Sequence, residues 1–215
     1  MTADAWTEIT DDAALTALLG EPTLAVRNKE RAALTDVDRD WLAASPFCVM
    51  GTADASGRCD VSPKGDPAGQ LVHVVDDTTI AIAERPGNRR ADGYRNILAN
   101  PYVGLNFLIP GRGDTLRING RARLVADAPF FDAMVVKGHR PLLAVVVEIE
   151  TIFFHCAKAF LRSQLWRPET WDPEARVPRR AVLAQRLERP GDSLELLDDY
   201  YGPRYEQGLY VTPPR

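Results

Sequence analysis

Apolar and polar residues follow a helical period in the first part of this chain of 215 residues. Residues 10–12 precede a short apolar stretch that Gly20 closes, which is the pattern of a capped helix. Further on, Thr35-x-x-Asp38 has the form of a capping box at the start of a second helix. We therefore predict a helical extension over residues 1–45.

After this extension the pattern changes to short apolar or alternating runs separated by turn residues, which predicts strands. The predicted strands are residues 47–53, 58–62, 71–75, 78–83, 103–109, 115–125 and 142–154. Tight turns join most of them, and only one helix, ending at Asn100-Pro101, lies in their midst. This order favours a mainly β fold with peripheral helices, an antiparallel barrel or sandwich, over a Rossmann fold built from βαβ units.

The predicted strand that begins at Thr115 alternates cleanly between two kinds of residue. One face has Leu116, Ile118, Gly120, Ala122 and Leu124, and the other has Arg117, Asn119, Arg121 and Arg123. The polar face is either solvated, or it lines a subunit interface or an anionic ligand.

The pattern weakens after Lys158, where prolines become frequent and residues 179–187 predict one more helix. Residues 198–215 hold four tyrosines and three prolines, and such an aromatic segment is expected to pack on the body or on a partner subunit. The chain thus divides into the extension, a β domain over residues 46–166, and a C-terminal helix and aromatic tail over residues 167–215.

Composition narrows the class of protein. A net charge of −4 and a pI of about 5.5 argue against a general nucleic-acid binder. Three widely spaced cysteines predict free thiols in a reducing compartment, and no stretch resembles a signal peptide or a membrane span. We expect a cytoplasmic protein without a metal site, since His73, His139 and His155 lack metal-ligand spacing.

Four arginines gather where the strand of residues 78–83 leads through a turn into the following helix. They are Arg85, Arg89, Arg90 and Arg95. A helix N-terminus offers unpaired N–H groups and partial positive charge, and arginine adds a fork that matches phosphate oxygens. This junction therefore predicts an anion site. Residues 62–69, with Ser62 and Lys64, are either an ordinary loop or a second wall of that site.

Taken together, these segments resemble the pyridoxamine 5′-phosphate oxidase-like, FMN-binding split-barrel superfamily, and most closely a bacterial branch of it. The resemblance runs from about Trp41 to Trp166. It is carried by residues 46–52, 62–66, 85–101 and 115–122. It implies a six-stranded antiparallel split β-barrel and a homodimer that binds FMN in two clefts between its subunits.

The resemblance also implies roles for particular residues. Arg89 and Arg90 match a basic pair that holds the FMN phosphate, and Asn88 stands where the oxidases have a serine. The strand ending at Lys64 matches a segment along the flavin. The implied cofactor-binding residues are Asp60, Val61, Ser62, Lys64, Arg85, Asn88, Arg89, Arg90, Thr115 and Trp166.

The chain departs from the oxidases near its C-terminus, where their Arg-x-His motif for the substrate phosphate is missing and His155 is the last histidine. We therefore expect an FMN-dependent oxidoreductase acting on another small molecule, with no catalytic residue identifiable. The alternatives are an F420-dependent reductase of the same fold, a flavin- or haem-binding module without catalysis, and a barrel that acts only as a dimeric scaffold.

Overall fold

A computed structural model describes residues 6–172 and 177–211 of the chain. Backbone contacts divide the chain into two units, Met1–Glu30 and Arg31–Arg215. The second predicted helix, α3 (Asp36–Ala44), lies in the second unit together with the strands.

The first unit contains the helices α1 (Asp12–Leu19) and α2 (Leu24–Arg27). The Asp11 carboxylate caps α1 by accepting a hydrogen bond from the backbone N–H of Ala14 at 2.8 Å. Gly20, with a φ of 80°, ends the helix in a conformation that glycine adopts readily. The predicted short helix is confirmed.

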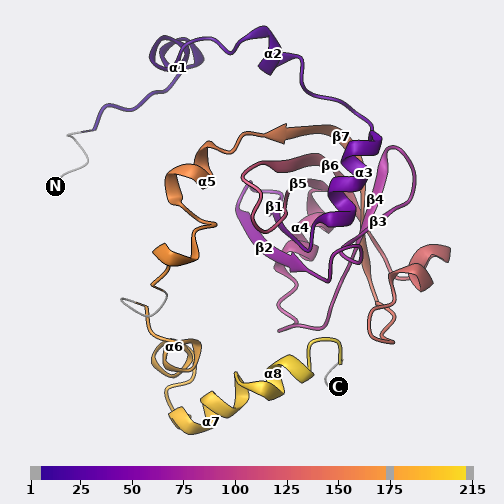
Figure 1. Ribbon diagram of the computed structural model, residues 1–215, viewed down its shortest axis with the longest axis vertical. Coiled ribbons are helices and arrows are strands. Elements are labelled where there is room, and N and C mark those ends of the chain that lie inside the picture. The colour runs from indigo at the N-terminus through magenta and orange to yellow at the C-terminus, as the bar shows by residue number, and fades with distance from the viewer. Residues whose placement is uncertain (1–5, 173–176, 212–215) are drawn as a thin grey trace. The chain divides into compact units, whose positions relative to one another are not determined.

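In the second unit, the strands lie together in one group with α3 beside them (Figure 1). After α3 the elements are β1 (Phe47–Ala53), β2 (Cys59–Gly65), β3 (Val72–Val74), β4 (Thr79–Ala83), α4 (Asp92–Ala99), β5 (Tyr102–Leu108), β6 (Thr115–Val125), the 3-10 helix η2 (Pro129–Met134), β7 (Ala144–His155), α5 (Lys158–Ser163), the 3-10 helix η3 (Pro168–Thr170), α6 (Arg180–Leu187), α7 (Leu194–Tyr200) and α8 (Pro203–Gln207). The helix predicted over residues 179–187 is therefore confirmed as α6.

The described strands form one antiparallel sheet in the order β2-β1-β5-β6-β7-β4-β3. The predicted mainly β, antiparallel architecture is confirmed. The sheet has seven strands among the described residues, one for each strand predicted from the sequence pattern, where the family resemblance implies six. β2 and β3 are the two edges.

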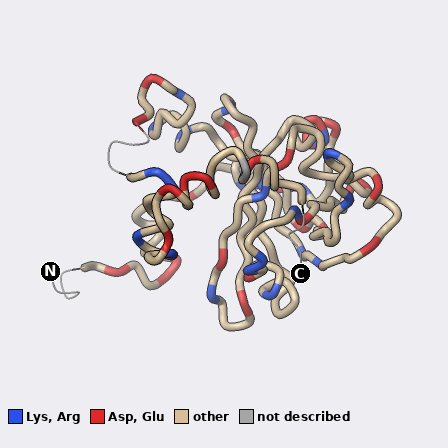
Figure 2. The backbone as a smooth tube through the Cα atoms, turned by 90° about the horizontal axis from the view of Figure 1, so that it is seen from below, with Lys and Arg blue, Asp and Glu red and all other residues tan. Residues whose placement is uncertain are grey.

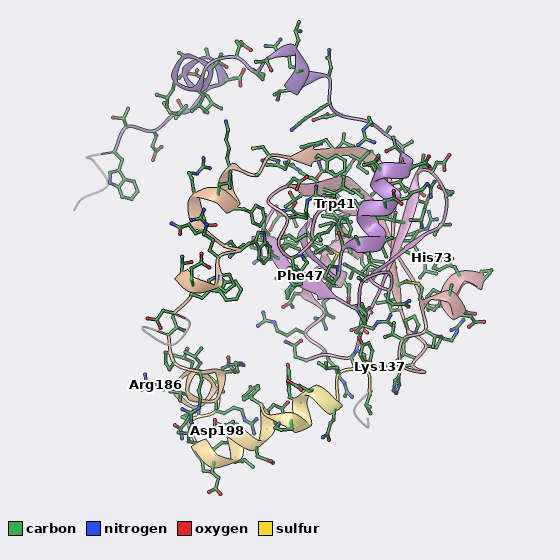
Figure 3. The ribbon with its side chains drawn as sticks, in the orientation of Figure 1. Trp41, Phe47, His73, Lys137, Arg186 and Asp198 are labelled. Atoms are coloured by element: carbon green, nitrogen blue, oxygen red, sulfur yellow. The ribbon has the colours of Figure 1, made fainter. Side chains whose placement is uncertain are left out.

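Alternation along the strands places one face of the sheet in the core. Phe107 on β5 and Ile118 on β6 are fully buried, while the arginines between the apolar positions of β6 are exposed. The alternation predicted for β6 is confirmed. Side chains fill the space enclosed by the sheet, and Trp41 lies between α3 and the strands (Figure 3). All five residues of β4 are buried, because η2 covers the sheet's second face there with Phe131 and Met134.

Strand β2 is longer than the sequence predicts. It continues through Pro63 and Lys64 to Gly65, where residues 62–69 are expected to leave the strand as a loop. Proline is tolerated because β2 pairs only with β1, and an edge strand does not need every backbone N–H for the ladder. This correction places Lys64 on the sheet, directly opposite Cys48 of β1.

Charges of both signs are interspersed along the backbone (Figure 2). On the polar face of β6, Arg123 forms an ion pair with Glu148 of β7, and Arg121 donates to the Tyr102 hydroxyl at 2.9 Å. Side chains on neighbouring strands thus bind Arg121 and Arg123. No described helix is both long enough and apolar enough to cross a membrane.

The C-terminal segment packs on itself and on the sheet domain. α6 and α7 enclose a small apolar cluster around Leu197. The rings of Tyr200, Tyr201 and Tyr205 contact one another. Tyr210 donates a hydrogen bond to Asp66, just beyond β2. Of these tyrosines, Tyr210 contacts the sheet domain, while residues 212–215 lie outside the described residues.

Helix α3 is fixed by a buried carboxylate. The predicted capping box is confirmed: Thr35 caps the helix and Asp38 bonds back to the Thr35 backbone N–H at 2.8 Å. Arg31 also donates to Asp38 at 2.9 Å. Burial acts to raise the pKa of Asp38, but these bonds outweigh it and lower the pKa. The stabilisation is therefore present above the unfolded-state pKa and is lost as the pH falls through the lower folded-state value.

We predict that Asp38→Ala lowers the free energy of unfolding by about 3 kcal/mol, because it leaves Arg31 and the helix N-terminus without their acceptor. Asp36→Ala, in the same turn but exposed, is the control and should change stability far less. Urea denaturation at pH 7 measures both. Equal effects would contradict the role assigned to Asp38.

Candidate functional site

A pocket of about 210 Å³ lies between strand β2 and the start of helix α4. It is lined by Met50, Asp60, Val61, Ser62, Pro63, Lys64, Asn88, Arg90, Ala91, Asp92, Gly93 and Tyr94. We call it the β2–α4 pocket. It brings together six residues of the predicted cofactor set: Asp60, Val61, Ser62, Lys64, Asn88 and Arg90.

Alternation along the edge strand builds one wall of this pocket. Asp60, Ser62 and Lys64 occupy the half-buried face of β2, while the residues between them are exposed. Helix α4 packs closely on this strand, since a Cβ added at Gly93 would lie 3.3 Å from the Asp60 carboxylate. A small residue at position 93 therefore allows the helix start to approach the strand.

The turn before α4 builds the opposite wall. Arg89 (φ 61°) and Ala91 (φ 57°) both have left-handed backbone, which non-glycine residues adopt infrequently. The Asn88 side chain supports the turn by accepting from the Arg90 backbone N–H at 3.0 Å. Ala91, at the N-cap of α4, provides no side-chain cap. The first residues of the helix line the pocket, so the partial positive charge of the helix start borders it.

Lys64 is the half-buried cation of the pocket. Its ammonium donates to the Tyr94 hydroxyl at 3.2 Å and lies 4.9 Å from the centre of that ring. Burial lowers the pKa of Lys64, and the nearby charges of Glu84 and Asp60 only partly oppose this. Burial likewise raises the pKa of Glu84. A charged lysine without full solvation would gain from an anion placed beside it.

Arg90 is the exposed cation of the pocket. Its Nε lies 2.5 Å from Asp92 in the first turn of α4, and Arg95 donates to the Arg90 carbonyl. An incoming anion would compete with Asp92 for the guanidinium. Because Arg90 is exposed, that ion pair is screened by solvent and exchanges readily.

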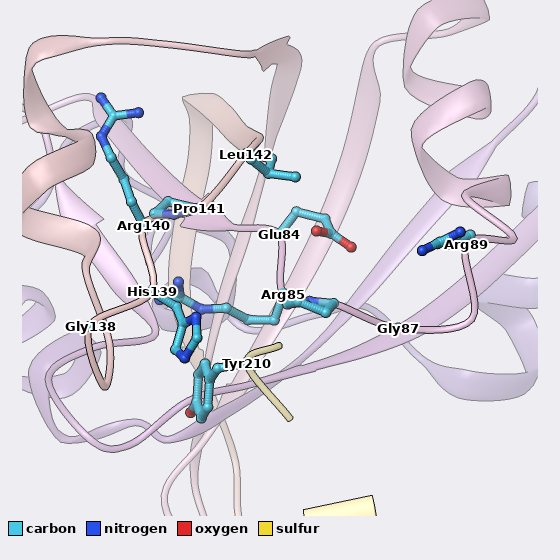
Figure 4. A pocket seen from close by; sticks show the side chains of 11 residues that line it. Glu84, Arg85, Gly87, Arg89, Gly138, His139, Arg140, Pro141, Leu142 and Tyr210 are labelled. Carbon is cyan, nitrogen blue, oxygen red and sulfur yellow. The ribbon is translucent and has the colours of Figure 1, made fainter. Parts of the chain in front are cut away.

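Arg85 and Arg89 lie elsewhere. The Arg85 Nε donates to the buried Asp66 at 2.7 Å, and Nη2 donates to the Met134 carbonyl at 3.0 Å. Both arginines line a second cavity of about 320 Å³ on the other side of the turn, with His139 and Tyr210 (Figure 4). The turn therefore separates two cavities.

Thr115 and Trp166 do not line the β2–α4 pocket. Thr115 lines a groove on the outer face of the sheet, together with Val61 and Asn106. Trp166 donates from its indole nitrogen to the Arg112 carbonyl at 2.6 Å and stacks on Phe160. Val61 lines both the groove and the β2–α4 pocket.

Sequence reasoning did not identify Tyr94 or Glu84, which surround Lys64. Tyr94 lies in the first turn of α4, and the helix start was the available indication that it would face the anion site. Glu84 follows the last residue of β4, and only the tertiary fold shows that its charge acts on Lys64. Cys48, opposite Lys64, is buried, which raises the pKa of its thiol to about 12 and argues against a nucleophilic role.

The chain was compared with known proteins. The family model described as "Pyridoxamine 5'-phosphate oxidase" matches residues 34–156, more than half of the chain. No curated protein matches the chain.

Several solved structures resemble the chain. HupZ from Group A Streptococcus is 19% identical over 56% of this chain and 93% of its own, with a TM-score of 0.45. An FMN-binding protein from Syntrophomonas wolfei is 15% identical over 55% of this chain and 88% of its own, with a TM-score of 0.41. An F420 reductase is 17% identical over 57% of this chain and 98% of its own, with a TM-score of 0.42.

We predict that Lys64→Met raises the melting temperature by about 2 °C, because a lowered pKa means that burial of the ammonium opposes folding below that pKa. Methionine keeps the length of the side chain without its charge. Lys158→Met, at an exposed position, is the control and should leave the melting temperature unchanged. Thermal unfolding at pH 7 decides, and a clear decrease for Lys64→Met would show that the ammonium stabilises the fold.

Proposed function

Because this chain belongs to the pyridoxamine 5′-phosphate oxidase family, we propose that it is an FMN-binding flavoprotein acting as an oxidoreductase on a small molecule. The observation that carries this proposal is the β2–α4 pocket, where Lys64, Arg90 and the N-terminus of α4 converge. A phosphate monoester carries a charge of about −1.5 to −2 near pH 7. Two cations and helix N–H groups are the donors that such a group requires.

The half-buried face of β2 continues the proposed phosphate site along the edge of the sheet. From Lys64 back to Asp60 the strand spans roughly 13 Å and presents Ser62 between them. The Ser62 hydroxyl can donate or accept hydrogen bonds with the hydroxyls of a ribityl chain, and the Asp60 carboxylate can accept them. Val61 is 65% exposed but lies on the opposite face of the strand, where it borders the outer groove. The residues on the half-buried face therefore fit the phosphate and then the ribityl chain of FMN.

FMN would supply the hydride or electron chemistry, while the chain's own residues bind and orient the reactants. Lys64, held by Tyr94, and Arg90 would neutralise the phosphate. Arg85 would brace the turn through Asp66, and Arg89, which lines the second cavity, would not contact the phosphate. We assign no general acid or base.

We propose that the outer face of β1, β5 and β6 docks a second copy of the chain. Gly51 and Gly104 leave this face flat beside the exposed Val61, and Asn106 and Thr115 border the same groove. The occupant is a second copy because Val61 joins this groove to the β2–α4 pocket, so a partner seated there would close the cofactor site. Thr115 and Trp166 would then act on the partner's cofactor.

The same seat would accept F420, a deazaflavin that also carries phosphate, or would serve a module that binds its ligand without turnover. The visible spectrum of the purified protein, followed by fluorescence titration with FMN and F420, separates these cofactors. A colourless protein that fails to bind added FMN would overturn the proposal. Tight binding without turnover in the presence of NAD(P)H or oxygen would favour the non-catalytic module.

We predict a dimer in solution, with twice the 23.8 kDa mass of the chain. Gly51→Arg should shift the protein to the monomer, because it places a long charged side chain on the flat face without a clash inside the protomer. Arg58→Ala, on the exposed turn after β1, is the control. Light scattering after size exclusion measures the mass, and a monomeric wild-type protein would contradict the interface.

We predict that Arg90→Ala weakens FMN binding by about tenfold, because it removes one charge-assisted contact to the phosphate. Riboflavin, which lacks the phosphate, should bind Arg90→Ala and wild type equally. Titration of flavin fluorescence measures both affinities, with Arg58→Ala as the control variant. An unchanged FMN affinity would show that the phosphate binds elsewhere.

A further inference from the structure

Tyr210, near the C-terminus, reaches a buried ion pair on the sheet domain. Its hydroxyl donates to Asp66 at 2.9 Å, while the other Asp66 oxygen accepts from Arg85 at 2.7 Å. The Asp66 side chain is only 1% exposed, and that of Arg85 is 13% exposed. The Tyr210 ring also lies 5.7 Å from the Arg85 guanidinium and 5.4 Å from the Lys137 ammonium. Tyr210 therefore supplies a hydrogen bond to the second oxygen of a buried carboxylate.

Figure 4 shows Tyr210 close to Arg85, at one end of the turn between β4 and α4. Tyr210 and His139 lie beside the Arg85 side chain, and Arg89 lies beyond Gly87 on the far side of the cavity. Tyr210 of the tail thus contacts Arg85, the first residue of the turn.

The rest of the tail faces the middle of the same turn. A groove of about 500 Å³ has residues 86–88 on one side and side chains of α7, α8 and the following segment on the other. The tail side of this groove is lined by Leu196, Asp199, Tyr200, Tyr205, Gly208, Leu209 and Val211. Asn88, which lines this groove, also lines the β2–α4 pocket.

The turn has reason to need such support. Arg89 and Ala91 have left-handed backbone, which persists only where the surrounding structure holds it. The same two residues flank Arg90, so their conformation decides whether its side chain points toward the β2–α4 pocket. The tail lies outside residues 34–156, the segment that matches the family.

We propose that the segment Leu194 to Val211 is a strap that orders the turn of residues 85–91, and that Tyr210 is a positioning residue for phosphate binding in the β2–α4 pocket. Tyr210 does not touch the phosphate. It acts through Asp66 and Arg85, which fix the first residue of the turn and so the direction of Arg90. Anion affinity falls by the fraction of molecules in which the turn is not ordered. The inference rests on the proposed function.

The test compares Tyr210→Phe with wild type, using FMN and riboflavin as probes. The variant keeps the ring and loses only the hydrogen bond to Asp66. We expect FMN to bind about fivefold more weakly, with riboflavin affinity unchanged, because only the phosphate contact depends on the turn. Tyr201→Phe removes a hydroxyl from the same segment, away from the groove and the ion pair, and should bind both flavins as wild type does.

An equal loss for both flavins would overturn the proposal, because a merely structural role weakens both. Unchanged FMN affinity would overturn it as well. If wild type binds neither flavin, the proposed function fails. Hydrogen exchange at the amides of residues 87–91 then tests separately whether the strap orders the turn. Faster exchange in Tyr210→Phe than in Tyr201→Phe supports the strap, and equal rates overturn it.

Discussion

The buried ion pair between Asp66 and Arg85 joins the two segments from which the candidate site is built. Asp66 follows the end of β2, and its backbone N–H donates to the Pro46 carbonyl at the start of β1. Arg85 follows β4 and begins the turn that leads to α4. Loss of one partner would leave a buried charge unpaired, at a cost of about 3–5 kcal/mol. The positions of Lys64 and Arg90 relative to each other therefore depend on this pair.

Two features of the site lower the stability of the fold and are suited to binding an anion. Lys64 lies half-buried between Tyr94 and the sheet, where burial lowers its pKa and opposes the charged form. The turn holds two non-glycine residues in left-handed backbone. A bound anion would offset the cost of the buried ammonium, and strained backbone of this kind is typical of binding sites. Both features therefore mark the β2–α4 pocket as a candidate anion site.

Much of the fold could be predicted from local pattern. The capping box at Thr35, the ends of α1 and the alternation along β6 all have a local physical cause, and each is found as expected. Local pattern alone ends β2 too early, because Pro63 indicates a loop unless the strand is known to be an edge, whereas the family resemblance implies a strand ending at Lys64. The short β3 lies within the predicted strand of residues 71–75 and pairs with β4, the next predicted strand.

For the site, sequence pattern and family resemblance together named the two segments that line the β2–α4 pocket, but not the direction of each side chain. Arg89 and Arg90 are adjacent, yet the left-handed residues of the turn send them to different cavities. The partner of Arg85 is Asp66, and that of Asp66 is Tyr210, 144 residues further along the chain. Such distant contacts leave no local pattern, so they appear only in the folded protein.

A crystal structure of the protein grown with FMN would test the central claim most directly. The account predicts phosphate density in the β2–α4 pocket, within hydrogen-bonding distance of Lys64, Arg90 and the first N–H groups of α4. Phosphate density in the second cavity, between Arg85 and His139, or at a surface away from both, would contradict it.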